Sequence, residues 1–193
     1  MKFRMLAIVA AMAISAGAQA ATLFSDDFDA NTQGLDKTPT GWSLSGPGDV
    51  DIIGTGFFDL IPGNGNYIDL DGSDGLAGTL LTPSTGTVSG TFTATFDLGG
   101  NHRDETVDLV TVKFGNATQT FMVAPNDSFT TYTMTTTANL DQLQISFHDG
   151  RDGNVGALLD NVSISSAVPE PGSLSLMFAG IAALGFAARR RRV

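Results

Sequence analysis

Residues 88–98 have the sequence VSGTFTATFDL, in which apolar and polar side chains alternate. From Thr91 to Leu98 the even positions hold Phe, Ala, Phe and Leu, and the odd positions hold Thr and Asp. A period of two places these two sets on opposite faces of a strand. The pattern therefore predicts an antiparallel strand with one face in a core and the other in water.

The surrounding residues, 22–165, have the same character and no helical periodicity. Alternating or β-branched runs are separated by clusters of Gly, Asn, Asp and Pro, the usual turn residues. Further strands are predicted at 42–44, 49–53, 66–70, 78–82, 107–114, 119–123, 129–137, 143–147 and 155–165. About ten short strands favour an all-β domain, a jelly-roll β-sandwich over residues 21–166.

The first twenty residues predict a secretory signal peptide that forms a short helix. Lys2 and Arg4 precede an apolar run over residues 5–14, and Ala18-Gln19-Ala20 is an A-x-A cleavage site. We therefore expect export through the secretion translocon and cleavage by signal peptidase near Ala21.

Residues 167–193 form a second targeting-type segment. Val168-Pro169-Glu170-Pro171 is a helix-breaking stretch, residues 173–188 carry no charge, and Arg189, Arg190, Arg191 and Arg192 follow. Sixteen uncharged residues are marginal for a membrane span, but arginine side chains extend such a helix and hold its end in the cytoplasm. The segment predicts a C-terminal transmembrane helix.

This tail resembles a PEP-CTERM sorting signal. The triplet Pro169-Glu170-Pro171, the apolar segment and the arginine cluster at 189–192 match that family in order and position. The resemblance implies recognition by an exosortase-type membrane protease in a Gram-negative bacterium. It also implies transient residence in the inner membrane, and then the cell surface or the extracellular biofilm matrix.

Charge is distributed unevenly along the chain. The formal net charge is −10, but nineteen acids and four basic residues lie between residues 21 and 166. The exported domain is therefore strongly acidic, which argues against nucleic acid as a partner. The absence of cysteine excludes disulfides, thiolate metal sites and a cysteine nucleophile.

Asp160 interrupts the apolar pattern of the last predicted strand. By parity it shares a face with Leu158, Val162 and Ile164, and an inward carboxylate is costly unless it is paired. A bound Ca²⁺ is one partner, with Asp27 and Asp29 of the first strand as further oxygen ligands if the first and last strands are neighbours. The alternative is that Asp160 lies at the wet end of its strand or accepts backbone N–H groups.

Four short motifs across the domain resemble those of galactose-binding-like jelly rolls, found in many carbohydrate-binding modules. They are Phe28-Asp29, Gly41-Trp42, residues 67–72 (YIDLDG) and residues 156–162 (GALLDNV). The resemblance implies a structural Ca²⁺ held by Asp29 and Asp160. The chain has Asp29 where relatives commonly have Glu. The shorter Asp side chain disfavours bidentate ligation of the ion.

Carbohydrate ligands are commonly bound by exposed aromatic rings. Trp42 matches a core position, so Phe57, Phe58 and Tyr67 beside a Gly-rich loop are the surface candidates, with core packing as the alternative. The polar loop Asn101–Glu105 adds His102 and Arg103 as candidate hydrogen-bonding residues, with a solvated loop as the alternative.

The sequence favours a non-enzymatic protein. The domain contains one Glu and two His, and neither a G-x-S-x-G nor an H-E-x-x-H motif. We expect an exported surface or matrix protein that associates with polysaccharide. The alternatives are an exported Asp-dependent polysaccharide hydrolase and a purely structural biofilm-matrix protein.

Overall fold

The computed structural model describes residues 20–76, 78–140, 144–150, 153–166 and 180. The expected signal peptide and sorting tail therefore lie outside the described residues, apart from Ala20 and Gly180. Within the described ranges, no helix has the length and apolar character needed to cross a membrane. The compact unit Ala21–Ala167 contains all of the strands.

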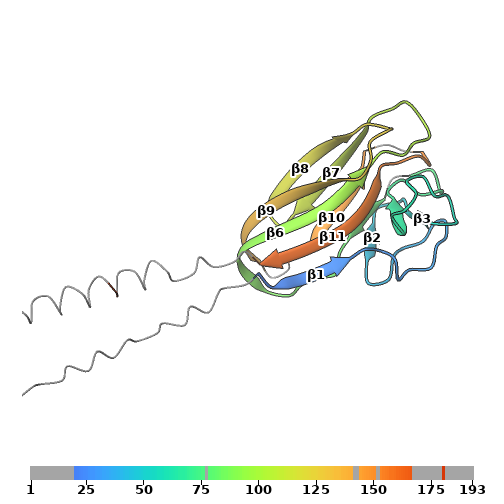
Figure 1. Ribbon diagram of the computed structural model, residues 1–193. Helices are drawn as coiled ribbons and strands as arrows, with labels where there is room; N and C mark the ends of the chain where they lie inside the picture. The colour runs from blue at the N-terminus through green and yellow to red at the C-terminus, as the bar shows by residue number, and fades with distance from the viewer. Residues whose placement is uncertain (1–19, 77, 141–143, 151–152, 167–179, 181–193) are drawn as a thin grey trace, which may run out of the picture. The chain divides into compact units, whose positions relative to one another are not determined.

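Two antiparallel sheets face each other (Figure 1). In the described chain the first sheet has the order β3-β4-β11-β6-β9, with β1 also paired to β11, and the second has the order β2-β5-β10-β7-β8. The strands are β1 (Thr22–Asp26), β2 (Ser43–Ser45), β3 (Asp51–Gly54), β4 (Asn66–Asp69), β5 (Thr79–Leu81), β6 (Val88–Gly99), β7 (Asp108–Phe114), β8 (Ala117–Val123), β9 (Thr130–Leu140), β10 (Ile145–Asp149) and β11 (Leu158–Ser166). The predicted all-β sandwich is confirmed, and a strand lies at each predicted location.

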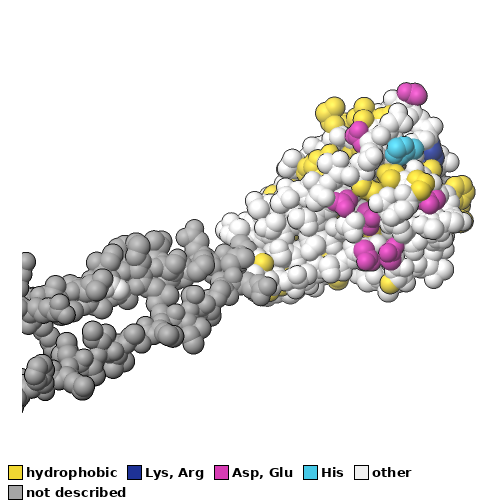
Figure 2. All heavy atoms as spheres, viewed as in Figure 1, with side chains coloured by type: hydrophobic (Ala, Val, Ile, Leu, Met, Phe, Trp, Pro, Cys, Tyr) yellow, Lys and Arg dark blue, Asp and Glu magenta, His cyan; other side chains and the backbone are white. Residues whose placement is uncertain are grey.

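The surface divides into an uncharged part and an acidic part. The outward positions of β6 and β9 pair threonines across the sheet, including Thr93 with Thr135 and Thr95 with Thr133. Figure 2 shows this surface as mainly uncharged, whereas acidic side chains gather toward the end that carries the loops around β3.

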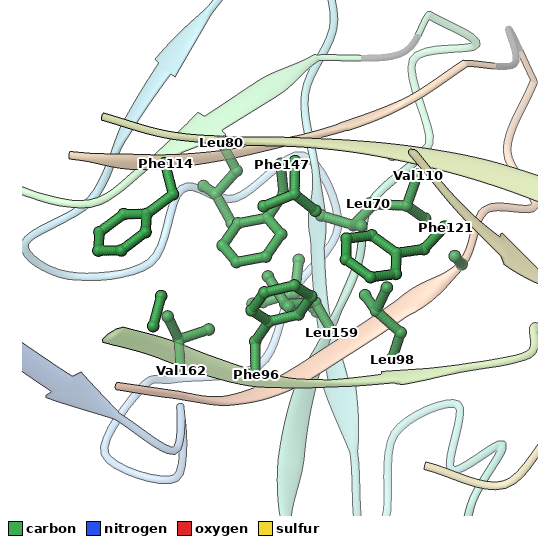
Figure 3. Packing of buried hydrophobic residues seen from close by; sticks show 14 of the residues in the cluster. Leu70, Leu80, Phe96, Leu98, Val110, Phe114, Phe121, Phe147, Leu159 and Val162 are labelled. Carbon is green, nitrogen blue, oxygen red and sulfur yellow. The ribbon is translucent and has the colours of Figure 1, made fainter. Parts of the chain in front are cut away.

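The core lies between the two sheets. Phe96 of β6 is fully buried and packs edge-on against Phe147 of β10, with ring centroids 5.1 Å apart, and against Phe121 of β8, at 5.4 Å. Figure 3 shows Phe96 and Leu98 directed from one sheet toward the aromatic rings of the other. Trp42 is also buried in this core, as its motif predicted.

A bulge in β11 changes which residues face the core. The register between β11 and β6 shifts between Asp160 and Ser163, and Asn161 has φ +50°. Val162 and Ile164 pack in the main core, whereas Leu158 packs in a second cluster with Ile53 and Tyr67. The expected shared face for Leu158, Asp160, Val162 and Ile164 is therefore wrong, because one extra residue reverses the alternation.

The first strand is adjacent to the last. Strand β1 pairs with β11 and ends with Asp26 opposite Val162. The chain then turns at Phe28, which has φ +57° and is fully buried. This pairing brings the carboxylates after β1 to the bulge that carries Asp160.

Candidate functional site

A pocket of about 250 Å³ opens beside strands β3 and β4. We call it the Phe58 pocket. Its lining residues are Leu35, Asp51, Ile53, Phe58, Asp69, Ser73, Arg103 and Asn154. Two of the residues predicted to bind ligand, Phe58 and Arg103, are therefore brought together, although they are far apart in the sequence. The pocket combines an aromatic ring with several hydrogen-bonding groups.

Phe58 is the most exposed aromatic side chain of this region, with 60% of its surface accessible. Its backbone has φ +50°, a conformation that costs energy for a bulky residue. Two hydrogen bonds of 2.8 Å between Gly54 and Phe57 close the turn before it. The half-buried Phe57 packs against Phe58, with ring centroids 4.9 Å apart, and also packs against the second core cluster. The exposed Phe58 ring is therefore held in position by a residue that contacts the core.

Tyr67 has a different role from the one expected. It is fully buried, and its hydroxyl accepts hydrogen bonds from the backbone N–H groups of Leu60 at 2.5 Å and Ile61 at 2.9 Å. The same hydroxyl donates to Asp59 at 3.2 Å. The expectation of a surface Tyr67 is wrong, because its hydroxyl is used to hold the loop after Phe58.

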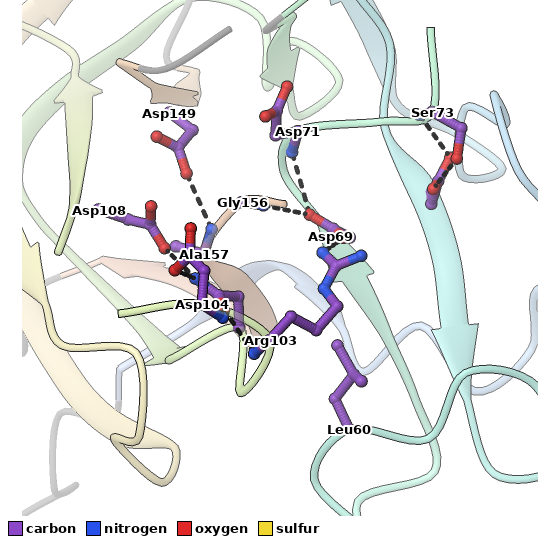
Figure 4. A network of polar contacts seen from close by, with 12 residues as sticks. Leu60, Asp69, Asp71, Ser73, Arg103, Asp104, Asp108, Asp149, Gly156 and Ala157 are labelled. Atoms are coloured by element: carbon purple, nitrogen blue, oxygen red, sulfur yellow. Dashed lines mark hydrogen bonds and ion pairs between the residues drawn. The ribbon is translucent and has the colours of Figure 1, made fainter. Parts of the chain in front are cut away.

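Arg103 forms an ion pair with Asp69 at the base of the pocket (Figure 4). Asp69 is 1% exposed, and its other oxygen accepts N–H groups from Asp71 at 3.2 Å and Gly156 at 3.1 Å. Burial raises the pKa of Asp69 to about 7, although the Arg103 guanidinium and the Asp71 N–H favour the ionised form. The carboxylate is thus held in place by three segments, which are the loop with Arg103, the turn after β4 and the residues before β11.

Asp51 supplies a second carboxylate, directly opposite Asp69 in the β3–β4 pair. It is 4% exposed and accepts the N–H of Asp36 at 2.8 Å and the hydroxyl of Ser73 at 2.6 Å. Sequence reasoning missed both aspartates as pocket residues. The signal was present, since each is an acidic residue within an apolar β run, like Asp160.

The loop that carries Arg103 is organised by Asn101. The Asn101 side chain is buried, accepts the N–H of Arg103 at 2.7 Å and donates to Asp108 at 3.0 Å. His102 is exposed, has φ +53° and lies 3.2 Å from the carbonyl of Asp127. His102 therefore does not line the Phe58 pocket with Arg103.

The predicted metal ligands lie at a different place, on the β1–β11 junction. Asp160 is 2% exposed and accepts the N–H of Asn161 at 2.7 Å. Its pKa is raised to about 7, mainly by burial and in addition by the charges of Asp97, Asp29 and Asp27. The structure therefore brings the predicted residues within electrostatic reach of one another.

The two partners of Asp160 differ in their other contacts. Asp29 is exposed, and its carboxylate accepts the N–H of Asn66 at 2.7 Å. Asp27 accepts the N–H of Asp29 at 3.2 Å and lines a pocket of about 420 Å³ with neighbours from β1 and β11. Solvent or an ion can thus reach this junction from the Asp27 side.

A second acidic group is more tightly gathered. In the described residues, Asp36, Asp49 and Asp51 are the group whose ligand atoms all lie within 4.8 Å of one another, and the predicted three do not meet that condition. The pKa of Asp49 is raised to about 7, mainly by burial and in addition by the neighbouring Asp36. The chain therefore offers two places where carboxylates repel one another.

The PEP-CTERM protein-sorting motif matches residues 167–192. The match covers the predicted Pro-Glu-Pro triplet, apolar segment and arginine cluster. Such a motif indicates an exported protein that is sorted to the cell envelope. A comparison with curated proteins gave no match.

The domain resembles solved jelly-roll structures at low sequence identity. The CBM22-1 xylan-binding domain of Paenibacillus barcinonensis Xyn10C is 16% identical with a TM-score of 0.52, over 81% of this chain and 100% of that one. The K3 cleaved adhesin domain of the Porphyromonas gingivalis Lys-gingipain is 15% identical with a TM-score of 0.52, over 77% and 100%. The tandem CBM22-1–CBM22-2 domain of Xyn10C is 19% identical with a TM-score of 0.54, over 82% and 50%. These similarities show the fold.

Proposed function

We propose that this chain is an exported, non-enzymatic protein whose jelly-roll domain binds polysaccharide in the Phe58 pocket. The observation that carries the proposal is the exposed Phe58 ring beside the polar side chains of Asp51, Ser73 and Arg103. An aromatic face packs against the apolar face of a sugar ring, and convergent polar groups bind its hydroxyls. The resemblance to a xylan-binding domain and to adhesin domains supports this reading.

The sorting motif supplies the address. An exosortase-type protease that recognises Pro169-Glu170-Pro171 would release the domain from the inner membrane of a Gram-negative cell. The domain would then remain at the cell surface or in the extracellular matrix. A polysaccharide ligand suits that location, because matrix polysaccharide would surround a protein released there.

We further propose that Asp160, Asp29 and Asp27 bind a structural Ca²⁺. Carboxylate oxygens are the ligands that Ca²⁺ prefers, and a divalent cation would offset both the burial of Asp160 and the repulsion from its acidic neighbours. The ion would tie the loop after β1 to the β11 bulge and stabilise the fold without taking part in chemistry.

The rival is an Asp-dependent hydrolase at the same pocket. Asp51 and Asp69 lie opposite each other and both line the pocket, as a pair of catalytic carboxylates would. Against this, Asp69 is held by Arg103 and two backbone N–H groups, so it is fixed as a structural acceptor. Release of reducing ends from a polysaccharide panel, abolished by Asp51→Asn, would support the rival.

The proposal is tested by affinity electrophoresis of the full chain in mild detergent, in gels that contain soluble polysaccharides. We expect at least one polysaccharide to retard the wild type and Phe58→Ala to lose that retardation. The matched control is Met122→Ala, because Met122 is 71% exposed on β8 and does not line the pocket. Equal retardation of the wild type and Phe58→Ala would contradict the assignment of the site.

A further inference from the structure

We propose that the Phe58 pocket is selective for uncharged sugar residues and rejects uronic acids. This inference rests on the proposed polysaccharide binding and adds the chemical class of the ligand. Three features of the pocket support it: the partners of its one described cation, the charge of its base and its size.

Arg103 is the side chain that would bind a sugar carboxylate, but it is already engaged. Its guanidinium is paired with the carboxylate of Asp69, and its backbone N–H is held by Asn101 at 2.7 Å. Asp69 is almost fully buried and is itself fixed by N–H groups of Asp71 and Gly156, so it cannot swing away to release the guanidinium. The Arg103 side chain is 31% exposed, but its charge is already offset by the buried carboxylate, so a ligand carboxylate would compete with Asp69 for the same guanidinium.

The remaining charge at the base of the pocket is negative. Asp51 is bonded to Ser73 and to the N–H of Asp36, and in the described ranges it has no cation within ion-pair distance. The lining thus contains two carboxylates and one guanidinium. A sugar carboxylate placed here would lie beside a like charge in a partly desolvated site, whereas sugar hydroxyls can donate to Asp51 or accept from Ser73.

The size of the pocket suits a single ring. Its volume of about 250 Å³ lies below the range of ~300–1,000 Å³ that is usual for larger ligands. One exposed aromatic ring, Phe58, offers one packing face. The ligand fitted by these features is one neutral pyranose or furanose residue of a chain.

The test compares neutral and uronate polymers with the full chain in mild detergent at about pH 8, where the Asp69 carboxyl is ionised. The probes are arabinoxylan, mixed-linkage β-glucan and galactan on one side, and polygalacturonate and alginate on the other. We expect a neutral polymer to bind at least about tenfold more tightly than either uronate polymer. The preference should persist at high salt, because salt screens the long-range charge of the domain but not contacts within the pocket.

The variant Asp69→Asn examines the cause of this selectivity. It frees Arg103, and we expect the ratio of uronate to neutral binding to rise several-fold. The control Glu105→Gln removes one exposed negative charge from the same loop and leaves the ion pair intact, so its ratio should stay at the wild-type value. Near-ultraviolet circular dichroism establishes that each variant is folded.

Each outcome is decisive. If the wild type binds uronate polymers as tightly as neutral ones, the proposed selectivity is overturned, but polysaccharide binding is still supported. This outcome does not depend on whether Asp69→Asn folds. Equal ratios for folded Asp69→Asn and for Glu105→Gln would also overturn the role of the ion pair. Failure of all five polymers to bind would instead overturn the proposed function itself.

Discussion

The hydroxyl of Tyr67 accepts a hydrogen bond from the backbone N–H of Ile61 at 2.9 Å. Tyr67 belongs to strand β4 and is fully buried, whereas Ile61 lies in the loop that follows Phe58. The bond therefore ties a core residue to the loop that presents the exposed aromatic ring. A residue expected to touch ligand acts instead on the position of its neighbour.

Replacement of Tyr67 by Phe should destabilise the loop after Phe58 and lower the free energy of unfolding. The N–H groups of Leu60 and Ile61 lose their acceptor in a partly buried place, which costs about 1–3 kcal/mol of unfolding free energy. Urea denaturation measures this loss. The control is Tyr132→Phe, since the Tyr132 hydroxyl makes no hydrogen bond within the described residues, and equal losses for the two variants would contradict the role of the loop.

Calcium should stabilise the domain through Asp160. We expect chelation with EDTA to lower the melting temperature and added Ca²⁺ to restore it. At saturating ion, Ca²⁺ binding should add about 3–4 kcal/mol to the free energy of unfolding. Asp160→Asn should remove this response because it removes one ligand charge from the buried junction. A response that survives Asp160→Asn but is lost in Asp49→Asn would place the ion at the Asp36, Asp49 and Asp51 group instead.

Stability should fall as the pH rises through the titration of Asp69. The folded-state pKa of about 7 lies above the ordinary value of 3.8, so the native state keeps this proton to higher pH than the unfolded chain does. The contribution is full below about pH 4 and is lost as the pH rises to about 7, with a slope of at most ~1.4 kcal/mol per pH unit. Urea midpoints across this window should change less steeply for Asp69→Asn than for the wild type, and parallel curves would disprove the assignment.

Gly65 should be less replaceable than Gly63. Both have positive φ, +70° and +96°, so alanine is strained at either position. A Cβ at Gly65 would in addition overlap the carboxylate of Asp29, whereas at Gly63 it would meet nothing within 4 Å. Thermal melts should show a larger loss for Gly65→Ala, together with a weaker response to Ca²⁺; equal losses would mean that Asp29 moves freely.

The strands could be predicted because their signals are local. The alternation from Phe92 to Leu98 is repeated in the structure, where the apolar positions are buried and the threonines face outward. Turn residues marked the boundaries within a few positions. The error came in β11, where the bulge at Asn161 reversed a parity that composition alone could not reveal.

The candidate site was predicted in part. Phe58 and Arg103 were predicted to bind ligand from their types and loop settings, and the structure places both at one pocket, but the pairing of Arg103 with Asp69 joins residues 34 positions apart. Tyr67 and His102 have the same kind of setting in the sequence, yet one is buried under a loop and the other does not line the pocket. Residue type indicates what a side chain can bind. It does not indicate which other residues of the chain that side chain already contacts in the fold.

The sequence by itself determined the sorting motif, the strands and the acidity of the domain, because each of these follows from the order of neighbouring residues. Only the tertiary structure decided which carboxylates are buried, which aromatic ring is exposed and whether Arg103 is free. These properties depend on strand pairing and on loops that meet across the sheet, where burial and hydrogen bonds set the energy of each charged group.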